Sequence, residues 1–225
     1  EIVNDSTDPA TPHLLVMSAT PIPRTLRLAS RGDLAFSRLD ELPAGRSPVT
    51  TKFVRGMERV EAYGRIREEV ENGHQVFIIC SLVEGSDVVE ARSATEEFTR
   101  LQSEEFGNYA DKMTLVHGRM PAAEKESAMR RFSNGEFMIM VATSVVEVGI
   151  DVPNATVMLI EDADRFGLSQ LHQFRGRVGR GTAAAYCYLA ADQPTPEAEQ
   201  RLLAEAAGVP AIQGPEGGEE EEYED

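Results

Sequence analysis

Three arginines alternate with three glycines in residues 170–181, whose sequence is Gln-Leu-His-Gln-Phe-Arg-Gly-Arg-Val-Gly-Arg-Gly. Arginine side chains stay charged and bind phosphate oxygens in pairs, and glycine lets a charged partner approach closely. At about 100° per helical residue, Arg177 and Arg180 would share one side and Arg175 would point nearly opposite. An arbitrary Arg/Gly cluster is more often a basic surface loop, so the choice depends on the rest of the chain.

Three other segments carry side chains suited to phosphate or nucleotide. They are residues 18–20 (Ser-Ala-Thr), 117–120 (His-Gly-Arg-Met) and 142–153 (Ala-Thr-Ser-Val-Val-Glu-Val-Gly-Ile-Asp-Val-Pro). Each follows an apolar run that reads as a strand. Because open α/β sheets bind ligands at the carboxyl ends of their strands, we expect all four segments to lie at such ends.

Each of these segments also has a structural interpretation. Small hydroxyl side chains often cap turns, and Asp151 is equally well explained as a turn-stabilising residue. In the functional interpretation, Thr143 holds a phosphate, Arg119 reaches one, and Asp151 accepts a hydrogen bond from a ribose or orients an arginine. Residues 40–41 (Asp-Glu) lie in a Pro/Gly-rich turn, so we reject them as a Mg²⁺ site.

The sequence contains no Gly-Lys dipeptide, and therefore no Walker A loop to hold the β- and γ-phosphates of a nucleotide. Arginines that face a nucleotide without such a loop are typical of one half of an ATPase.

From residue 49 onward, short apolar runs alternate with segments of helical spacing. The expected strands are residues 49–54, 75–80, 113–116, 137–141, 156–160 and 184–190, and the expected helices are 57–72, 88–106, 121–132 and 196–207. This alternation predicts an α/β fold with a doubly wound, mainly parallel sheet flanked by helices.

Composition narrows the class of protein. The chain has 225 residues, 41% of them hydrophobic, and no apolar run of 18 residues, so we expect a globular core and no membrane span. Cys80 and Cys187 lie inside apolar runs and are expected to be buried thiols of a cytoplasmic protein. The N-terminus shows neither a signal peptide nor an initiator Met, which we interpret as a fragment or a processed chain.

The net charge of −16 argues against a surface that binds nucleic acid all over. Residues 216–225 carry seven of the acidic groups and no basic ones, which leaves −9 for the remainder. Arginines gather locally in residues 24–31 and 175–180, so a basic cleft stays possible.

Together, the order and spacing of these segments resemble the second RecA-like motor lobe of superfamily 2 helicases. Residues 18–20 are similar to motif III, 142–153 to motif V and 173–180 to motif VI. Residues 17–25 (Met-Ser-Ala-Thr-Pro-Ile-Pro-Arg-Thr) and 166–173 (Phe-Gly-Leu-Ser-Gln-Leu-His-Gln) resemble the group of RecG and the transcription-repair coupling translocases. Residues 32–34 and 40–46 are more similar to the RecG family of bacterial DNA helicases.

The resemblance implies a domain organisation. Residues 1–48 would be the end of a first motor lobe and a linker, and residues 49–192 a RecA-like helicase C-terminal domain. Composition, and not the resemblance, predicts a C-terminal helix in residues 193–207 and a disordered acidic tail in residues 208–225. ATP and Mg²⁺ would be held mainly by a first lobe that this chain lacks.

The resemblance also assigns roles to single residues. Arg177 and Arg180 would be catalytic arginine fingers, which stabilise charge as the γ-phosphoryl group leaves. The other assignments are Gln173, Gly149 and Asp151 for nucleotide binding, Ser18 and Thr20 for coupling of hydrolysis to lobe movement, and Thr143, Arg24 and Arg119 for DNA binding. No metal ligand is expected in this chain.

The implied function is that of an ATP-dependent helicase that remodels branched or duplex DNA, such as stalled forks and Holliday junctions, together with a first RecA-like lobe and a wedge domain. The chain alone is expected neither to hydrolyse ATP nor to unwind DNA. The alternatives are a lobe of a transcription-repair coupling translocase and a non-catalytic RecA-like module that binds DNA or regulates. An RNA helicase is disfavoured only by the RecG-like segments.

Overall fold

The computed structural model describes residues 48–81, 87–143 and 151–208, all of which fall in one compact unit, Pro43–Pro210. The residues expected to form the linker and the acidic tail lie outside these ranges, so the predicted domain boundaries stay predictions. No helix among the described residues is long and apolar enough to cross a membrane.

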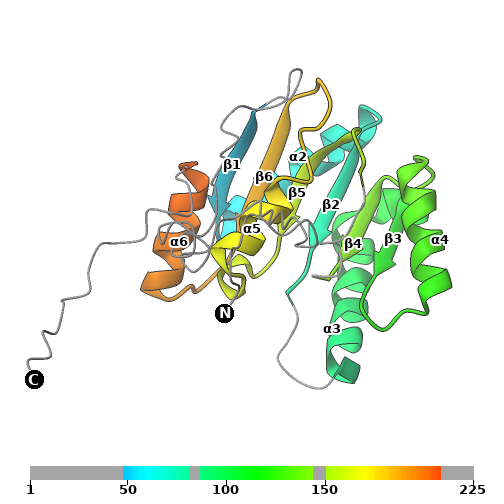
Figure 1. Cartoon of the computed structure of the whole chain (residues 1–225), viewed down its shortest axis with the longest axis horizontal. Helices are drawn as coiled ribbons and strands as arrows, with labels where there is room; N and C mark the ends of the chain where they lie inside the picture. The colour runs from blue at the N-terminus through cyan, green and yellow to red at the C-terminus, as the bar shows by residue number, and fades with distance from the viewer. Residues whose placement is uncertain (1–47, 82–86, 144–150, 209–225) are drawn as a thin grey trace, which may run out of the picture. The chain divides into compact units, whose positions relative to one another are not determined.

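A six-stranded parallel sheet forms the centre of the unit, with strand order β1-β6-β5-β2-β4-β3 (Figure 1). Its strands are β1 (Val49–Val54), β2 (Gln75–Ile79), β3 (Met113–Val116), β4 (Ile139–Ala142), β5 (Ala155–Ile160) and β6 (Ala185–Ala190). All strands point the same way, so the residues that follow them share one edge of the sheet. The prediction of a doubly wound parallel sheet is confirmed.

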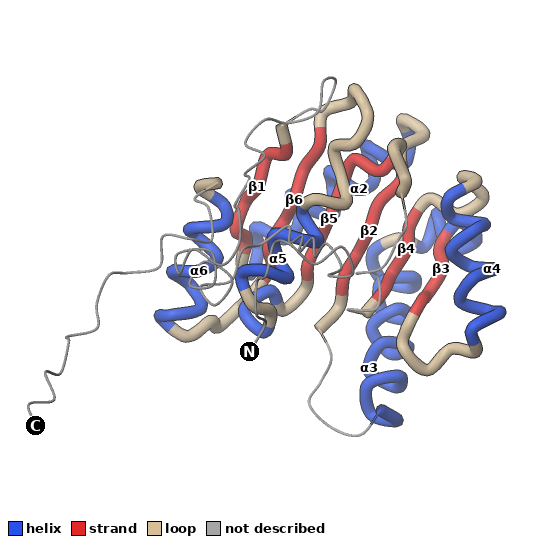
Figure 2. Tube along the Cα trace, in the orientation of Figure 1, coloured by secondary structure: helices blue, strands red, loops and turns tan. Residues whose placement is uncertain are grey.

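Helices cover both faces of this sheet (Figure 2). The helices are α2 (Arg59–Glu71), α3 (Asp87–Arg100), α4 (Ala122–Ser133), α5 (Leu168–Arg175) and α6 (Pro196–Ala206). Side chains of β2 alternate between two cores: Phe77 packs with Phe132 of α4 and Phe174 of α5, while Ile78 packs with Ile66 of α2. Burial on both faces explains why these strands read as continuous apolar runs in the sequence.

The helix expected over residues 88–106 ends earlier than predicted. Helix α3 stops at Arg100 and continues as a π-helical turn, Leu101–Glu105. The amide of Phe106 donates to the carbonyl of Leu101 over 2.8 Å, a bond that spans five residues. This spacing lets two fully buried side chains, Leu101 and Phe106, face the same core, which regular α-helical spacing would not allow.

Substitution of Phe132 by Ala tests the core on the α4 side. The Phe132 ring is fully buried and lies 5.0 Å from that of Phe77, centroid to centroid. We expect the change to lower the free energy of unfolding by about 3–5 kcal/mol, since it removes buried area and leaves a cavity. Urea unfolding followed by circular dichroism measures this loss. Met57→Ala, at a side chain that is 86% exposed, should change stability by no more than about 0.5 kcal/mol.

The two cysteines are free and buried, as expected. Burial raises the pKa of the Cys187 thiol to about 12 and also raises the pKa of Cys80. Both groups are therefore protonated thiols at about pH 8, and we expect neither to react with Ellman's reagent until the chain unfolds. Rapid labelling of the folded chain, at the rate seen in concentrated guanidinium chloride, would contradict this expectation.

Candidate functional site

Four of the predicted site residues lie outside the described residues: Ser18, Thr20, Arg24 and Gly149. The structure divides the others between the two opposite edges of the sheet. Residues of the arginine-rich segment and Asp151 lie toward the amino ends of β5 and β6, while Thr143 and Arg119 lie at the carboxyl ends of β4 and β3.

Helix α5 carries the first part of the arginine-rich segment. At its start, the Gln170 side chain accepts a hydrogen bond from the amide of Gly167 (3.2 Å), and Leu171 and Phe174 point into the core. The helix ends at Arg175 with Gly176 as its C-cap. Arg177 and Arg180 therefore lie beyond the helix, and the prediction that they share one helical side is wrong. A glycine just past a periodic segment is a helix-stop signal that was present in the sequence.

Beyond α5 the chain returns to the amino ends of the strands. The amide of Gly179, at φ +71°, donates to the carbonyl of Ala155, the first residue of β5 (3.4 Å). Gly181 passes so close to Pro153 that an added Cβ would lie 2.7 Å from the Pro153 carbonyl oxygen. The expectation that all four segments sit at carboxyl ends is thus wrong for this one, because the connection from β5 to β6 must cross the sheet to begin a parallel strand.

Arg180 and Asp151 meet at this amino edge. Nη1 of Arg180 lies 2.9 Å from Oδ1 of Asp151, and its Nε donates to the carbonyl of Gly176 (3.2 Å). Of the two functional interpretations left open for Asp151, the orientation of an arginine is the one that this contact matches. The Asp151 side chain is 68% exposed, so the pair is open to solvent and to an incoming ligand.

Arg177 and Gln173 lie close to this pair along the chain. The Arg177 amide donates to the carbonyl of Phe174 (2.9 Å), which fixes the turn after α5, and both Arg177 and Gln173 are half-buried. Their contacts with a nucleotide stay predictions.

Arg175, the last residue of α5, makes a different contact from Arg180. Its Nη1 lies 3.4 Å from Oε1 of Glu205 on α6, and Nδ1 of His172 lies 3.6 Å from the same oxygen. Glu205 is only 1% exposed, and its other oxygen has no partner among the described residues. Nothing in the sequence signals this buried carboxylate, because a glutamate near the end of a surface helix normally faces water.

At the opposite edge, the ends of β3 and β4 bring His117, Arg119 and Thr143 together. The amide of Thr143 donates to the carbonyl of Val116 (3.2 Å), and Lys125 of α4 donates to the carbonyl of Gly118 (3.3 Å). Burial lowers the pKa of His117, and the charges of Lys125 and Arg119 add to this effect.

Exposure distinguishes the two predicted DNA contacts at this edge. Arg119 is exposed, whereas Thr143 is 1% exposed and its Oγ1 has no hydrogen-bond partner within the described part of the chain. Lys125, which was not predicted from the sequence, adds a second cation next to Arg119. The arrangement can attract an anion mainly through these two side chains.

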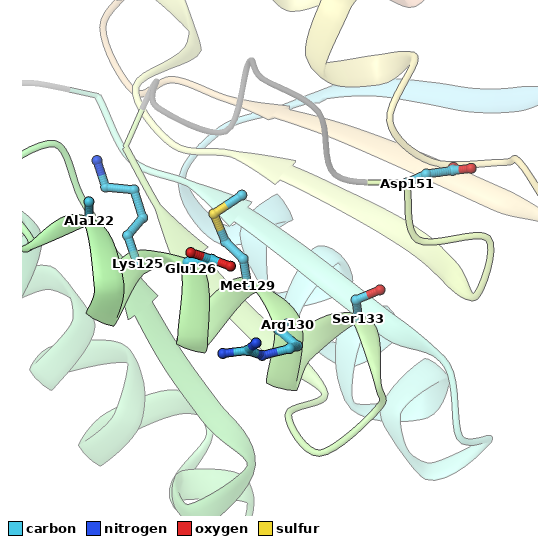
Figure 3. Close-up of a pocket in the computed structure, with 7 residues that line it drawn as sticks. All are labelled: Ala122, Lys125, Glu126, Met129, Arg130, Ser133 and Asp151. Atoms are coloured by element: carbon cyan, nitrogen blue, oxygen red, sulfur yellow. The ribbon is translucent and has the colours of Figure 1, made fainter.

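A hollow of about 530 Å³ lies between the exposed face of α4 and Asp151 (Figure 3). Lys125, Glu126 and Arg130 line its α4 side, so its charge is mixed. Within the described ranges, no group of three His, Cys, Asp or Glu side chains is placed to hold a metal ion.

Comparison with known proteins identifies the family. The sequence model of the helicase conserved C-terminal domain matches residues 58–182. The chain is 50% identical over 191 residues to the ATP-dependent DNA helicase RecG of Synechocystis, which covers 85% of this chain and 23% of that protein. It is 52% identical over 179 residues to RecG of Aquifex aeolicus, which covers 79% of this chain and 22% of that protein. The chain thus spans about a quarter of the length of the curated relatives that it matches.

Solved structures agree with this result. A structure of RecG bound to a three-way DNA junction is 46% identical, with a TM-score of 0.69, and the match covers 86% of this chain and 25% of that chain. Yeast Dbp5 bound to RNA and ADP BeF3 is 14% identical, with a TM-score of 0.54, and the match covers 85% of this chain and 47% of that chain. At this identity the similarity is one of fold only. With a six-stranded parallel sheet, an arginine-rich segment after α5 and close similarity to RecG, the chain belongs to the helicase conserved C-terminal domain family.

Proposed function

We propose that this chain is the second motor lobe of an ATP-dependent DNA helicase that acts on branched DNA. The observation that carries the proposal is the contact between Arg180 and Asp151 at the amino edge of the sheet, in a chain about 50% identical to RecG. The RecG relatives support this function over that of a transcription-repair coupling translocase.

On the nucleotide side, Arg177 and Arg180 act as arginine fingers toward ATP held by a first RecA-like lobe. Asp151 keeps the Arg180 guanidinium in place before the nucleotide arrives. An ion pair this exposed contributes only about 0.2–1 kcal/mol, so the more highly charged γ-phosphate can displace Asp151. Gln173 and Gly149 contribute nucleotide contacts, while Mg²⁺ and most of the phosphate contacts belong to the first lobe.

Helix α6 keeps α5 in the orientation that presents these arginines. The buried Glu205 is paired with Arg175, and a buried carboxylate that loses its partner is costly. Leu202 of α6 packs in the same core as Phe174. Both contacts hold the end of α5, from which Arg177 and Arg180 follow.

On the DNA side, Arg119 and Lys125 attract phosphates of branched or duplex DNA at the carboxyl ends of β3 and β4. We assign further DNA contacts to Thr143 and Arg24, and the coupling of hydrolysis to lobe movement to Ser18 and Thr20. The RecG relative in complex with a three-way junction supports branched DNA as the partner. A wedge domain and the first lobe complete the working protein.

Substitution of Arg177 by Ala tests the finger assignment. We expect the ATPase rate of this chain, mixed with a separately produced first lobe and DNA, to fall about 10³-fold, because charge on the transferring phosphoryl group loses its partner. The chain alone should show no DNA-stimulated ATPase activity.

The matched control is Arg131→Ala, which removes an exposed guanidinium near the C-terminus of α4 that pairs with Glu136. The ATPase rate of this variant, mixed with the first lobe, should equal the rate of the unmodified mixture. The two lobes should associate equally well with the unmodified chain and with either variant. An Arg177→Ala mixture with an unchanged rate means that Arg177 is not a finger.

Salt dependence tests the DNA contact of Arg119. With the lobes mixed and a fluorescent three-way junction as probe, Arg119→Gln should reduce the slope of log affinity against log salt by about one. The exposed Arg201 of α6, changed to Gln, is the control and should leave the slope unaltered. Equal slopes for Arg119→Gln and the unmodified chain would remove Arg119 from the DNA interface.

A further inference from the structure

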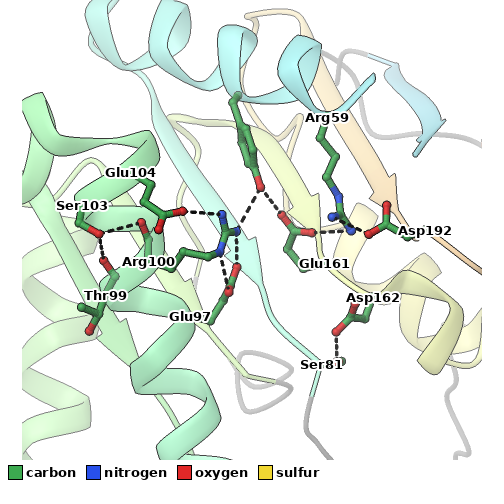
Figure 4. A network of polar contacts seen from close by, with 11 residues as sticks. Arg59, Ser81, Glu97, Thr99, Arg100, Ser103, Glu104, Glu161, Asp162 and Asp192 are labelled. Atoms are coloured by element: carbon green, nitrogen blue, oxygen red, sulfur yellow. Dashed lines mark hydrogen bonds and ion pairs between the residues drawn. The ribbon is translucent and has the colours of Figure 1, made fainter. Parts of the chain in front are cut away.

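A second hollow, of about 510 Å³, opens at the carboxyl edge of the sheet between the start of α2 and the described part of α3. Its floor is formed by the residues that follow β2, β5 and β6, among them Glu161, Asp162 and Asp192 (Figure 4). Volumes of about 300–1,000 Å³ are typical of clefts that take a ligand or several side chains of a partner. The proposed helicase function leaves this hollow unused.

The rim of the hollow is apolar on one side. Met57, in the 3₁₀ turn Gly56–Glu58, and Val60, near the start of α2, both line it and are 86% and 60% exposed. Among the described residues, only one other large hydrophobic side chain, Leu203 of α6, is exposed. Two of three such side chains thus border the same hollow, which is the pattern of a docking surface rather than of scattered surface residues.

The ionisable groups that line the hollow are mostly acidic. Five carboxylates and two guanidinium groups line it, and both guanidinium groups already have acidic partners. Arg59 pairs with Glu161 (3.3 Å) and Asp192 (3.0 Å). Arg100 pairs with Glu97 (2.6 Å) and Glu104 (3.8 Å) and also contacts the hydroxyl of Tyr63 (3.4 Å).

Asp162 is the carboxylate of the hollow that lacks a cation. Its Oδ2 accepts a hydrogen bond from the Ser81 hydroxyl (2.8 Å), and among the described residues no Lys, Arg or His pairs with it. Asp162 is exposed and adopts a left-handed backbone conformation, with φ +47° and ψ +47°. This conformation turns the chain at the end of β5 and is tolerated by Asp and Asn better than by other side chains.

Burial makes the neighbouring carboxylate sensitive to further negative charge. Glu161 is 6% exposed, accepts a hydrogen bond from Tyr63 (2.9 Å), and has a pKa raised by burial in spite of Arg59. A phosphate brought here would face this carboxylate, Asp162 and Asp192. Nucleic acid is therefore repelled from this half of the edge, whereas Arg119 and Lys125 attract it to the other half.

We propose that the hollow and its Met57/Val60 rim dock a partner protein through a basic segment, which places an Arg or Lys side chain against Asp162 and an apolar side chain over the rim. The charge of the hollow and its apolar border both match such a segment. The surface lies on the half of the carboxyl edge away from Arg119 and Lys125 and at the opposite edge from Arg180 and Asp151, so a partner bound there leaves both proposed sites free.

A pair of synthetic peptides tests this surface with the 225-residue chain. One is a fluorescein-labelled dodecapeptide of alternating Arg and Leu residues, and the other has Glu in place of every Arg. Fluorescence anisotropy should show saturable binding of the basic peptide, weakened by salt, and none of the acidic one. With methyl-labelled methionine, the Met57 methyl resonance should shift on binding.

Two substitutions separate the contributions of charge and rim. Asp162→Asn keeps the left-handed turn. It should lower the affinity for the basic peptide about threefold, as expected for the loss of one exposed ion pair. The double variant Met57→Ser/Val60→Ser, which changes exposed side chains only, should weaken it about tenfold. Leu203→Ser and Glu124→Gln, exposed positions on α6 and α4, are the matched controls and should leave binding unchanged.

Several outcomes would overturn the proposal. Equal binding of the two peptides, or equal weakening by Leu203→Ser, would show that the contact is not made at this hollow. If the chain self-associates, loses this association in Met57→Ser/Val60→Ser and does not bind the basic peptide, the surface contacts a second copy of the chain. If a three-way DNA junction displaces the labelled peptide at a lower concentration than the unlabelled peptide does, the surface binds nucleic acid.

Discussion

The parallel arrangement of the six strands is the constraint on which the rest of this structure depends. Each connection between parallel strands must cross a face of the sheet, and helices supply the apolar cover for both faces. The crossings also produce two chemically distinct edges. Arg180 and Asp151 meet at the edge where β5 and β6 begin, while Arg119, after β3, and Lys125 of α4 lie at the opposite edge.

Strands were the part of the fold that the sequence predicted best, since short runs rich in β-branched and aromatic residues between turn signals favour a strand over a helix. The order of those strands could not be predicted in the same way, because it depends on which face each crossing helix takes. The π-helical turn at Leu101–Glu105 was equally out of reach, as it reflects where Leu101 and Phe106 must both be buried.

In the arginine-rich segment, the candidate residues could be chosen from the sequence, but the positions of their side chains depend on tertiary structure. Residue types and order led to the assignment of Arg177 and Arg180 as arginine fingers, which stays a prediction. Helical spacing then led to the wrong geometry, because Gly176 ends α5 and the chain turns back toward Ala155. The pairing of Arg175 with Glu205 needed the structure, since nothing in the sequence distinguishes a buried glutamate on α6 from its exposed neighbours.

The backbone contacts at Gly179 and Gly181 have a mechanical consequence. They hold the arginine segment against Ala155, the first residue of β5, and against Pro153 just before that strand, so its position does not rely on flexible side chains. At about 3.3 Å per residue, the six residues of β5 separate the two edges of the sheet by roughly 20 Å. A rotation of the lobe about an axis between the two edges would therefore move the arginines at one end of the strands and Arg119 at the other end in opposite directions.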